Sequence, residues 1–230
     1  MSALQTVIVP INTAGYPFIA AFAIVAFLLS FVAGELGWIG FILTAWCVYF
    51  FRDPPRVVPQ DPNFLISPAD GTVVKIEKVM PPAELEMGSD RLTCVSVFLN
   101  VFDVHVNRAP CAGKILKKSY RPGKFMNAAF DKASTDNERM AIKLLHESGK
   151  EIAFVQIAGW VARRIICDVD EGDFVLAGQR YGLIRFGSRA DLYLPEGIEP
   201  QVIIGQKMVA GETVIANLEG PQLARFGDKI

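Results

Sequence analysis

The apolar positions of the chain follow two different patterns, and the change between them lies near residue 52. Residues 1–51 are dominated by apolar side chains, and Glu35 is the only charged one. From residue 64 on, apolar residues come in short runs that alternate with polar ones and are broken by Gly and Pro. Long apolar runs indicate helices, and short alternating runs bounded by turn residues indicate strands. The sequence therefore predicts a helical segment followed by a β domain.

The helical segment contains two apolar runs, which we expect to form a hairpin. The first is PFIAAFAIVAFLLSFVA (17–33), and the second is WIGFILTAWCVYFF (38–51). As helices they would be about 25 Å and about 21 Å long, somewhat short of the ~30 Å hydrocarbon core of a bilayer. They are either two thin spans or a hairpin embedded in one leaflet. A signal peptide fits poorly, because no Lys or Arg precedes the first run and a second run follows.

A hairpin buried in a protein core is the alternative, but the end of the second run favours a membrane. Trp46, Tyr49 and Arg52 cluster there, as residues do at a membrane interface. Arg52 and Arg56 also favour the cytoplasmic side for the domain that follows. We therefore expect a membrane-associated hairpin (1–51), a Pro-rich linker without regular structure (52–63) and a β domain (64–230).

The β domain is expected to be mainly β, a sandwich or open barrel with small helices. Gly residues precede apolar alternation in SPADGTVVKI (67–76) and VLAGQRYGLI (175–184), an arrangement that resembles lipoyl-like domains. One short helix is expected at 160–169. Strands are expected at 71–79, 92–102 and 114–120, in a hairpin across 137–159 with its turn at 147–150, within 173–186, and as a further pair within 201–218.

Charge and cysteine content exclude several classes of function. The net charge of -1 does not indicate a nucleic-acid partner, which usually needs a basic face. The four cysteines contain no C-x-x-C pair, so they indicate neither a disulfide framework nor a zinc site, and no metal site is expected. Buried, structural thiols in a reducing cytoplasm are the expectation for Cys47, Cys94, Cys111 and Cys167.

Few side chains of catalytic type are available. Of the two histidines, His146 lies beside the predicted hairpin turn and is expected to be solvated, whereas His105 lies in an apolar alternation on a predicted strand. Asp70 comes at a strand entrance, and Ser188 follows a Gly in RFGSRADLYLP. Ser188, His105 and Asp70 are the residue types of a nucleophile, base and acid triad. Ordinary turns and a structural histidine are the alternatives for these three positions.

Four segments together resemble a known family. They are ISPADGTV, VFLNVFDVHVNRAP, GKFMNAAFDKASTDNERM and RFGSRADLYLP, and they follow the family's order through most of the β domain. DKASTDNER with FGS downstream is the specific combination. In these segments the chain resembles the short-form phosphatidylserine decarboxylase proenzymes, which are pyruvoyl-dependent enzymes. The apolar N-terminal segment matches the membrane association of that family.

The resemblance implies that the proenzyme processes itself. Asp70 would orient His105, and His105 would activate Ser188, whose Oγ would attack the carbonyl of Gly187. The resulting ester would eliminate to dehydroalanine, which hydrolyses to a pyruvoyl group and ammonia. The chain would divide between Gly187 and Ser188 into a large β subunit and a small α subunit.

The resemblance also implies the reaction and the partners. The pyruvoyl cofactor derived from Ser188 would form a Schiff base with phosphatidylserine and accept the electrons released as CO₂ leaves. His105 would donate the proton, and phosphatidylethanolamine would be the product. The expected partners are the substrate phosphatidylserine and the bilayer of the inner membrane, with the catalytic domain on its cytoplasmic side. The two fragments are expected to form a heterodimer, or a higher oligomer of it.

The chain departs from the family pattern at two places. Long-form members carry a second His shortly before the matched one, but here residues 102–104 are Phe, Asp and Val. Residue 189 is Arg, where many members have Thr or Ser. Two other classes of function stay open on the residues alone. One is a membrane-anchored, non-catalytic lipoyl-like module, and the other is a serine hydrolase that uses Ser188, His105 and Asp70 on an external ester.

Overall fold

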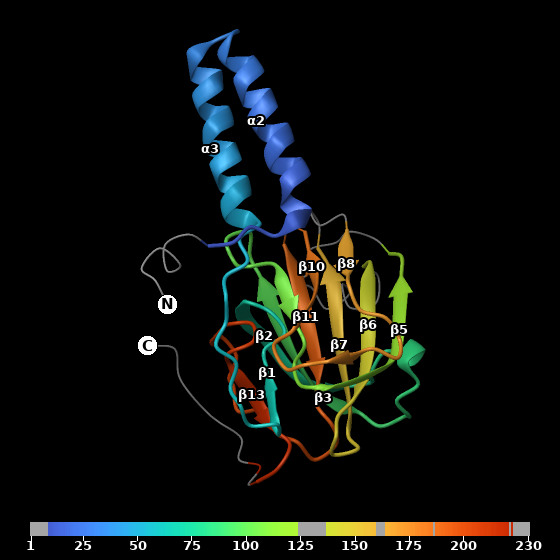
Figure 1. Ribbon diagram of the computed structural model, residues 1–230. Coiled ribbons are helices and arrows are strands. Elements are labelled where there is room, and N and C mark those ends of the chain that lie inside the picture. Colours follow the sequence, from blue (N-terminus) through green and yellow to red (C-terminus); the bar gives the residue numbers. More distant parts are fainter. Residues whose placement is uncertain (1–8, 124–136, 160–163, 186, 221, 223–230) are drawn as a thin grey trace. The chain divides into compact units, whose positions relative to one another are not determined.

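The chain forms two compact units in a computed structural model, Met1–Pro55 and Arg56–Ile230 (Figure 1). The structure describes residues 9–123, 137–159, 164–185, 187–220 and 222. Each unit is considered by itself. The first contains the apolar hairpin, and the second contains the strands.

The first unit is a hairpin of two apolar helices, as expected. A 3₁₀ turn (η1, Thr13–Gly15) leads into α2 (Tyr16–Ser30), and α3 (Gly34–Phe50) follows. The helices approach closely at two glycines. A Cβ added to Gly37 would lie 2.7 Å from Cβ of Ser30, and one added to Gly40 would lie 2.6 Å from Cβ of Ala26. Small residues therefore allow this helix contact, as in membrane helix pairs.

The other faces of the hairpin are apolar and exposed. Ile24, Phe27, Trp38 and Ile42 are all more than half exposed. The segment Thr13–Ser30 is long and apolar enough to cross a membrane, and Gly34–Phe50 is a shorter apolar helix. One such helix is weak evidence of membrane association. Apolar surface on every outward face adds to it, because such a helix is stable only inside a protein or a membrane.

In its described residues, the second unit contains three antiparallel sheets. The large sheet has eight strands in the order β12-β2-β3-β11-β7-β6-β5-β9, a smaller one has the order β4-β10-β8, and β1 pairs with β13. A 3₁₀ turn, η2 (Ala83–Leu85), lies between β2 and β3. The strands are β1 (Phe64–Ile66), β2 (Gly71–Val79), β3 (Leu92–Leu99), β4 (Val106–Arg108), β5 (Gly113–Arg121), β6 (Arg139–Leu145), β7 (Glu151–Ala158), β8 (Ile165–Cys167), β9 (Phe174–Val175), β10 (Arg180–Ile184), β11 (Ser188–Tyr193), β12 (Lys207–Met208) and β13 (Val214–Asn217).

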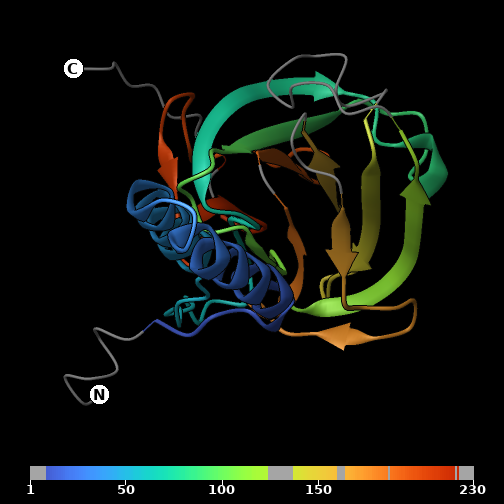
Figure 2. The ribbon, with the colours of Figure 1, turned by 90° about the horizontal axis from the view of Figure 1, so that it is seen from above.

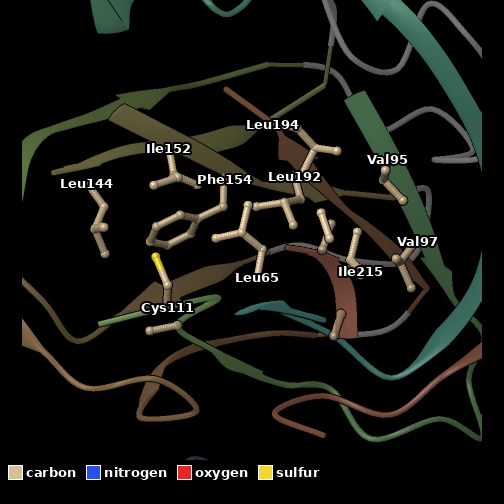
Figure 3. Packing of buried hydrophobic residues seen from close by; sticks show 14 of the residues in the cluster. Leu65, Val95, Val97, Cys111, Leu144, Ile152, Phe154, Leu192, Leu194 and Ile215 are labelled. Atoms are coloured by element: carbon tan, nitrogen blue, oxygen red, sulfur yellow. The ribbon is translucent and has the colours of Figure 1, made fainter. Parts of the chain in front are cut away.

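The eight-stranded sheet curls, and its middle strands are buried on both faces. Figure 2 shows the curl from the teal strand β2 round to the light green strand β5. Alternate residues such as Val97, Phe154 and Leu192 point into the main core (Figure 3). Residues of opposite parity, such as Val155 and Tyr193, pack in a second cluster with Leu85 of η2. This double burial explains the nearly continuous apolar runs of these strands.

Most of the predicted strands are confirmed, and the mainly β fold is confirmed with them. β2 has the predicted bounds, and β6 and β7 form the predicted hairpin. β12 and β13 lie within 201–218 but pair with β2 and β1 instead of with each other.

The helix predicted at 160–169 is wrong where the structure describes that segment. Ile165–Cys167 forms β8, which pairs with β10, and residues 160–163 lie outside the described residues. Two adjacent β-branched residues, Ile165 and Ile166, favour a strand. Their cross-strand partners, Ile184 and Leu183, provide the apolar contact.

Candidate functional site

The predicted nucleophile, Ser188, lies at one end of the large sheet. It is the first residue of β11 and pairs with Leu99 of β3 on one side and Ala158 of β7 on the other. Its side chain is fully buried. Its Oγ has no hydrogen-bond partner among the described residues. A buried hydroxyl without a partner costs roughly 1–3 kcal/mol, so its position calls for a functional explanation.

The backbone just before Ser188 has an unusual conformation. Gly187 has a φ of +60°, in the left-handed region that favours glycine. A Cβ added there would meet nothing within 4 Å. A residue with a side chain would therefore be strained by this φ, although there is space for its Cβ. The Gly187–Ser188 bond thus joins a left-handed residue to the start of a buried strand.

His105 is fully buried and lies immediately before β4, so the expectation that it lies on a strand is wrong by one residue. Its backbone carbonyl still accepts a hydrogen bond from the N–H of Ile184 in β10, at 3.2 Å. Its Nδ1 lies 2.9 Å from the carbonyl oxygen of Asp103. Because a carbonyl can only accept, Nδ1 carries the proton and Nε2 carries the lone pair. Nε2 is therefore the nitrogen that can act as a base.

The pairing of the strands brings His105 and Ser188 toward the same interior space. His105, Ile184 and Ile165 lie opposite one another across the small sheet, and cross-strand neighbours share a face. Ile184 and Ile165 pack on Ala158 of the large sheet. Ala158 is in turn the cross-strand neighbour of Ser188. His105 and Ser188 therefore face the region around Ala158 from two different sheets.

Asp70 lies at the entrance of β2, as predicted, and its contacts are to an arginine and a backbone N–H. Arg56 Nη2 donates to both carboxylate oxygens, at 2.7 and 3.0 Å, and the Ala210 N–H donates to Oδ1 at 2.7 Å. Burial raises the pKa of Asp70, while these two partners lower it. The charge of Asp103 also raises it, which places the turn before His105 near Asp70.

Gly71 fixes the place of Asp70 beside the end of β3. Its φ is +150°, and an added Cβ would lie 2.2 Å from the carbonyl oxygen of Phe98. The residue after Phe98 is Leu99, the cross-strand neighbour of Ser188. The close approach of β2 to β3 thus brings Asp70 to the same end of the sheet as Ser188.

Buried amides that sequence reasoning did not single out connect these elements. Gln156 Nε2 of β7 donates to Asn107 Oδ1 of β4 at 2.9 Å. Asn107 Nδ2 in turn lies 3.4 Å from the carbonyl oxygen of Pro68, two residues before Asp70. Asn137 Nδ2 donates to the carbonyl of Ala158 at 2.7 Å. Asn107 lies in HVNRAP and Asn137 in DNER, which are parts of the segments that resemble the family. Their position in these segments was the one sequence feature that could have identified them.

Arg189 lies on the opposite face of β11 from Ser188. It makes a bidentate ion pair with Asp191, at 2.8 and 2.9 Å, and both side chains are buried. A pocket of about 400 Å³ opens on this face, lined in part by Asp191, Tyr193 and Arg139. Ser188 does not line it. Arg189, where this chain departs from the family pattern, therefore forms a buried ion pair within the protein.

The expectation that His146 is solvated is wrong. The side chain is buried, with Nδ1 2.8 Å from Ser148 Oγ and Nε2 3.0 Å from the carbonyl oxygen of Pro62. The segment around Pro62 covers the turn between β6 and β7. That turn is at the other end of β7 from Ala158, so His146 has a structural place away from Ser188.

The side chains of metal-ligating type lie apart from one another in the part of the chain that the structure describes. No group of three or more His, Cys, Asp or Glu side chains there could hold a metal ion. Cys94 and Cys111 are buried, and burial raises the pKa of Cys111 to about 12. That thiol is protonated at neutral pH and behaves as a core side chain.

Comparisons with known proteins point to one family. The family model described as phosphatidylserine decarboxylase matches residues 43–216. A phosphatidylserine decarboxylase proenzyme of Paramagnetospirillum magneticum is 56% identical over 219 residues, which cover 95% of this chain and 91% of the relative. One from Cereibacter sphaeroides is 56% identical over 97% of each chain, and one from Ruegeria pomeroyi is 54% identical over 95% of this chain and 100% of the relative.

Proposed function

The chain belongs to the phosphatidylserine decarboxylase family, and we propose that it cleaves itself between Gly187 and Ser188 and then decarboxylates phosphatidylserine to phosphatidylethanolamine. One observation carries the proposal. Ser188 Oγ is buried without a described hydrogen-bond partner, directly after a left-handed glycine and facing the same interior as His105. These features support the assignment of Ser188 as nucleophile, His105 as base and Gly187–Ser188 as the bond that is cleaved.

The first stage needs only groups of this chain and one water molecule. His105 Nε2 takes the proton of Ser188 Oγ, and Oγ attacks the carbonyl carbon of Gly187. The amide C–N bond breaks, the nitrogen takes a proton, and an ester replaces the amide. Loss of the Cα proton of residue 188 then expels Gly187 as a carboxylate and leaves dehydroalanine. Water converts this to the pyruvoyl group with release of ammonia.

Two further groups support His105 in this stage. The Asp103 carbonyl fixes the tautomer, so that Nε2 is the nitrogen that receives the proton. Asp70, held by Arg56, supplies a negative charge at the same end of the sheet. We assign Asp70 to stabilising the imidazolium that forms. A carboxylate that stabilises a transient positive charge lowers the barrier to proton transfer.

The residues around position 188 fit a pyruvoyl group. The side chain is buried at the first residue of a strand, and its oxygen has no described hydrogen bond to lose on conversion. When formed, this group supplies a conjugated carbonyl that accepts the electron pair released with CO₂. His105 is the candidate to return a proton to the carbon that has lost CO₂. Burial excludes water that would compete in this step.

The two fragments stay together after cleavage in this proposal. The small fragment contributes β11, which lies between β3 and β7, and also β12 and β13, which pair with β2 and β1. Removing β11 would break the hydrogen bonds of two strands in the middle of the sheet. The apolar hairpin would hold the enzyme in the inner membrane, with the catalytic unit on the cytoplasmic side, so that the lipid substrate need not leave the bilayer.

Mass spectrometry of the purified protein tests the proposal. We expect two chains, Met1–Gly187 and a fragment starting at residue 188 without a free amino group. Ser188→Ala is expected to stay intact, and His105→Ala to stay intact or to cleave at least 100-fold more slowly. An intact wild-type chain that reacts with fluorophosphonate would point to a serine hydrolase. An intact, unreactive chain would point to a non-catalytic module.

A further inference from the structure

The segment Arg56–Val58 begins the second unit, and contacts with residues far away in the sequence fix it there. The N–H of Val57 donates to Glu212 Oε1 at 3.0 Å. A Cβ added to Gly178 would lie 2.4 Å from Cγ2 of Val58, so the segment lies where a glycine leaves room for it. The segment has no regular secondary structure, but specific contacts define its place.

Arg56 binds the carboxylate of Asp70 from this segment. Its Nη2 donates to both carboxylate oxygens, at 2.7 and 3.0 Å, and the two side chains are only 11% and 15% exposed. The N–H of Ala210 donates to Oδ1 at 2.7 Å. A Cβ added to the next residue, Gly211, would lie 3.6 Å from Cβ of Arg56, so the arginine packs against this loop. The carboxylate is therefore held by Arg56 and by the loop between β12 and β13.

Backbone pairing places Asp70 next to His105. Segments 66–68 and 108–110 pair antiparallel through two backbone hydrogen bonds, of 2.8 and 2.9 Å. Each pair of residues makes only one bond, because one of its members is a proline without an N–H. Continued by two residues, this register places Asp70 opposite Val106, the residue that follows His105. Asp70 and His105 are therefore neighbours at this edge of the small sheet.

The charge of Asp70 depends on these surroundings. Burial raises its pKa, whereas the Ala210 N–H and the charge of Arg56 lower it, and the charge of Asp103 raises it again. Further charged or titratable groups on the neighbouring segments are Arg108, Glu212 and His105. Arg56 is the cation in direct contact with the carboxylate. Without Arg56, Asp70 would take up a proton at a higher pH.

We propose that Arg56 is a positioning residue for self-cleavage, which holds the ionised carboxylate of Asp70 where it stabilises the imidazolium of His105. This inference rests on the proposed function. A carboxylate that is already fixed in place stabilises a developing positive charge without reorganisation during the reaction. Arg56 acts through Asp70, while Ser188 and His105 carry out the chemistry. The processing site therefore extends to the segment that begins the second unit.

The pH dependence of self-cleavage tests this assignment. The full chain is labelled by a short pulse of cell-free synthesis and transferred to buffers between about pH 5 and pH 9, and its conversion to two fragments is followed with time. We expect the acid limb of the rate profile of Arg56→Gln to lie about one pH unit higher than that of wild type, which makes cleavage about tenfold slower on this limb. Near pH 9 the two rates should differ less than about threefold, because Asp70 is then ionised in both proteins.

Two further variants complete the comparison. Arg56→Lys keeps the positive charge and should restore most of the acid limb, although it lacks the planar donor group of arginine. Arg91→Gln is the matched control, since it removes an exposed arginine just before β3, at the end of that strand remote from Leu99. It should cleave as wild type at every pH.

A titration that needs no cleavage separates this inference from the proposed function. In the Ser188→Ala chain, ¹³C NMR of side-chain-labelled aspartate gives the pKa of Asp70, whose signal is identified by its loss in Asp70→Asn. We expect Arg56→Gln to raise this pKa by about one unit or more, and Arg91→Gln to leave it unchanged. Should Arg56→Gln not fold, Arg56→Lys provides the same test with a smaller shift.

Two results would overturn the assignment. One is a cleavage rate of Arg56→Gln that is unchanged, or lower by the same factor at every pH, because a merely structural arginine would act at all pH values. The other is a pKa of Asp70 that does not rise when Arg56 is replaced. An intact wild-type chain would refute the proposed function instead, and the titration would still judge whether Arg56 controls the charge of Asp70.

Discussion

The left-handed backbone at Gly187, the residue whose carbonyl would be attacked, is accessible to glycine without strain but not to most other residues. An L-residue with a Cβ costs about 1–2 kcal/mol in this region. We expect Gly187→Ala, made in a Ser188→Ala background to prevent cleavage, to lower Tm by roughly 2–8 °C. Gly187→Asn should lower it less, because Asn tolerates this conformation better. Equal Tm values for all three proteins would show that this φ is not held in solution.

The buried carboxylate of Asp70 predicts a pH dependence of stability. Burial raises its pKa above the ordinary value of about 4. The folded state therefore holds this proton more tightly than the unfolded state, and this contribution to stability is lost as pH rises from about 4 through the folded pKa. Asp70→Asn cannot ionise. The free energy of unfolding of Asp70→Asn relative to its parent should thus increase with pH over that range.

Urea unfolding of the two proteins between pH 4 and pH 8, both in the Ser188→Ala background, measures this difference. The attraction of Arg56 for ionised Asp70 is already contained in the folded pKa. The difference between neutral Asp70 and Asn adds an offset that depends little on pH, so the slope, and not the absolute difference, is the test. Parallel profiles would contradict a raised pKa at Asp70.

Sequence reasoning at the residue scale identified candidate side chains but not their partners. Ser188, His105 and Asp70 could be identified from the sequence because each is a reactive residue type within a distinctive segment. Arg56 was not, because it lies in the expected linker and reaches Asp70 only through the fold. The burial of His146 was not predicted for the same reason, since the carbonyl of Pro62 that its Nε2 contacts is 84 positions away in the sequence.

At the scale of elements, the approach of β2 to β3 is what brings the Asp70 segment to the site. A side chain at Gly71 would collide with the carbonyl oxygen of Phe98 at 2.2 Å. We expect Gly71→Ala to destabilise the protein by at least about 3 kcal/mol and to slow self-cleavage. Gly88→Ala is the control, because Gly88 has a φ of +82° but open space around its Cα. Thermal unfolding in the Ser188→Ala background should rank Gly71→Ala well below Gly88→Ala, and equal losses would exclude the backbone contact.

Local pattern predicted most strands but not their order. The alternation in GTVVKIEKV is a property of the segment itself, and β2 has the bounds it indicates. The position of β11 between β3 and β7 depends on pairings over many tens of residues, which no local pattern encodes. The segment containing β8 is short and apolar, so its periodicity does not distinguish helix from strand. Pairing with β10 determines that this segment is a strand.

At the scale of the whole molecule, the strand order makes self-cleavage compatible with a stable enzyme. The proposed scissile bond lies at the first residue of a central strand, outside the paired segment that follows. Cleavage there frees one chain end beside His105 while the pairs of β11 with β3 and β7 remain. The same fold can therefore serve first as a processing site and afterwards as the frame of the mature active site.

Charged substitutions on the outward faces of the hairpin are expected to weaken binding to the membrane. Ile24 and Phe27 are more than half exposed, so charged substitutions there should leave the contact between α2 and α3 intact. Each charge near the middle of a membrane helix costs about 2.5–3.5 kcal/mol. We expect Ile24→Asp/Phe27→Glu to cleave itself normally, but to float poorly with phospholipid vesicles and to decarboxylate vesicle phosphatidylserine at least tenfold more slowly. Ile24→Leu/Phe27→Leu should match wild type in both assays. A charged variant that floats and reacts as wild type would mean that protein, and not lipid, covers these faces.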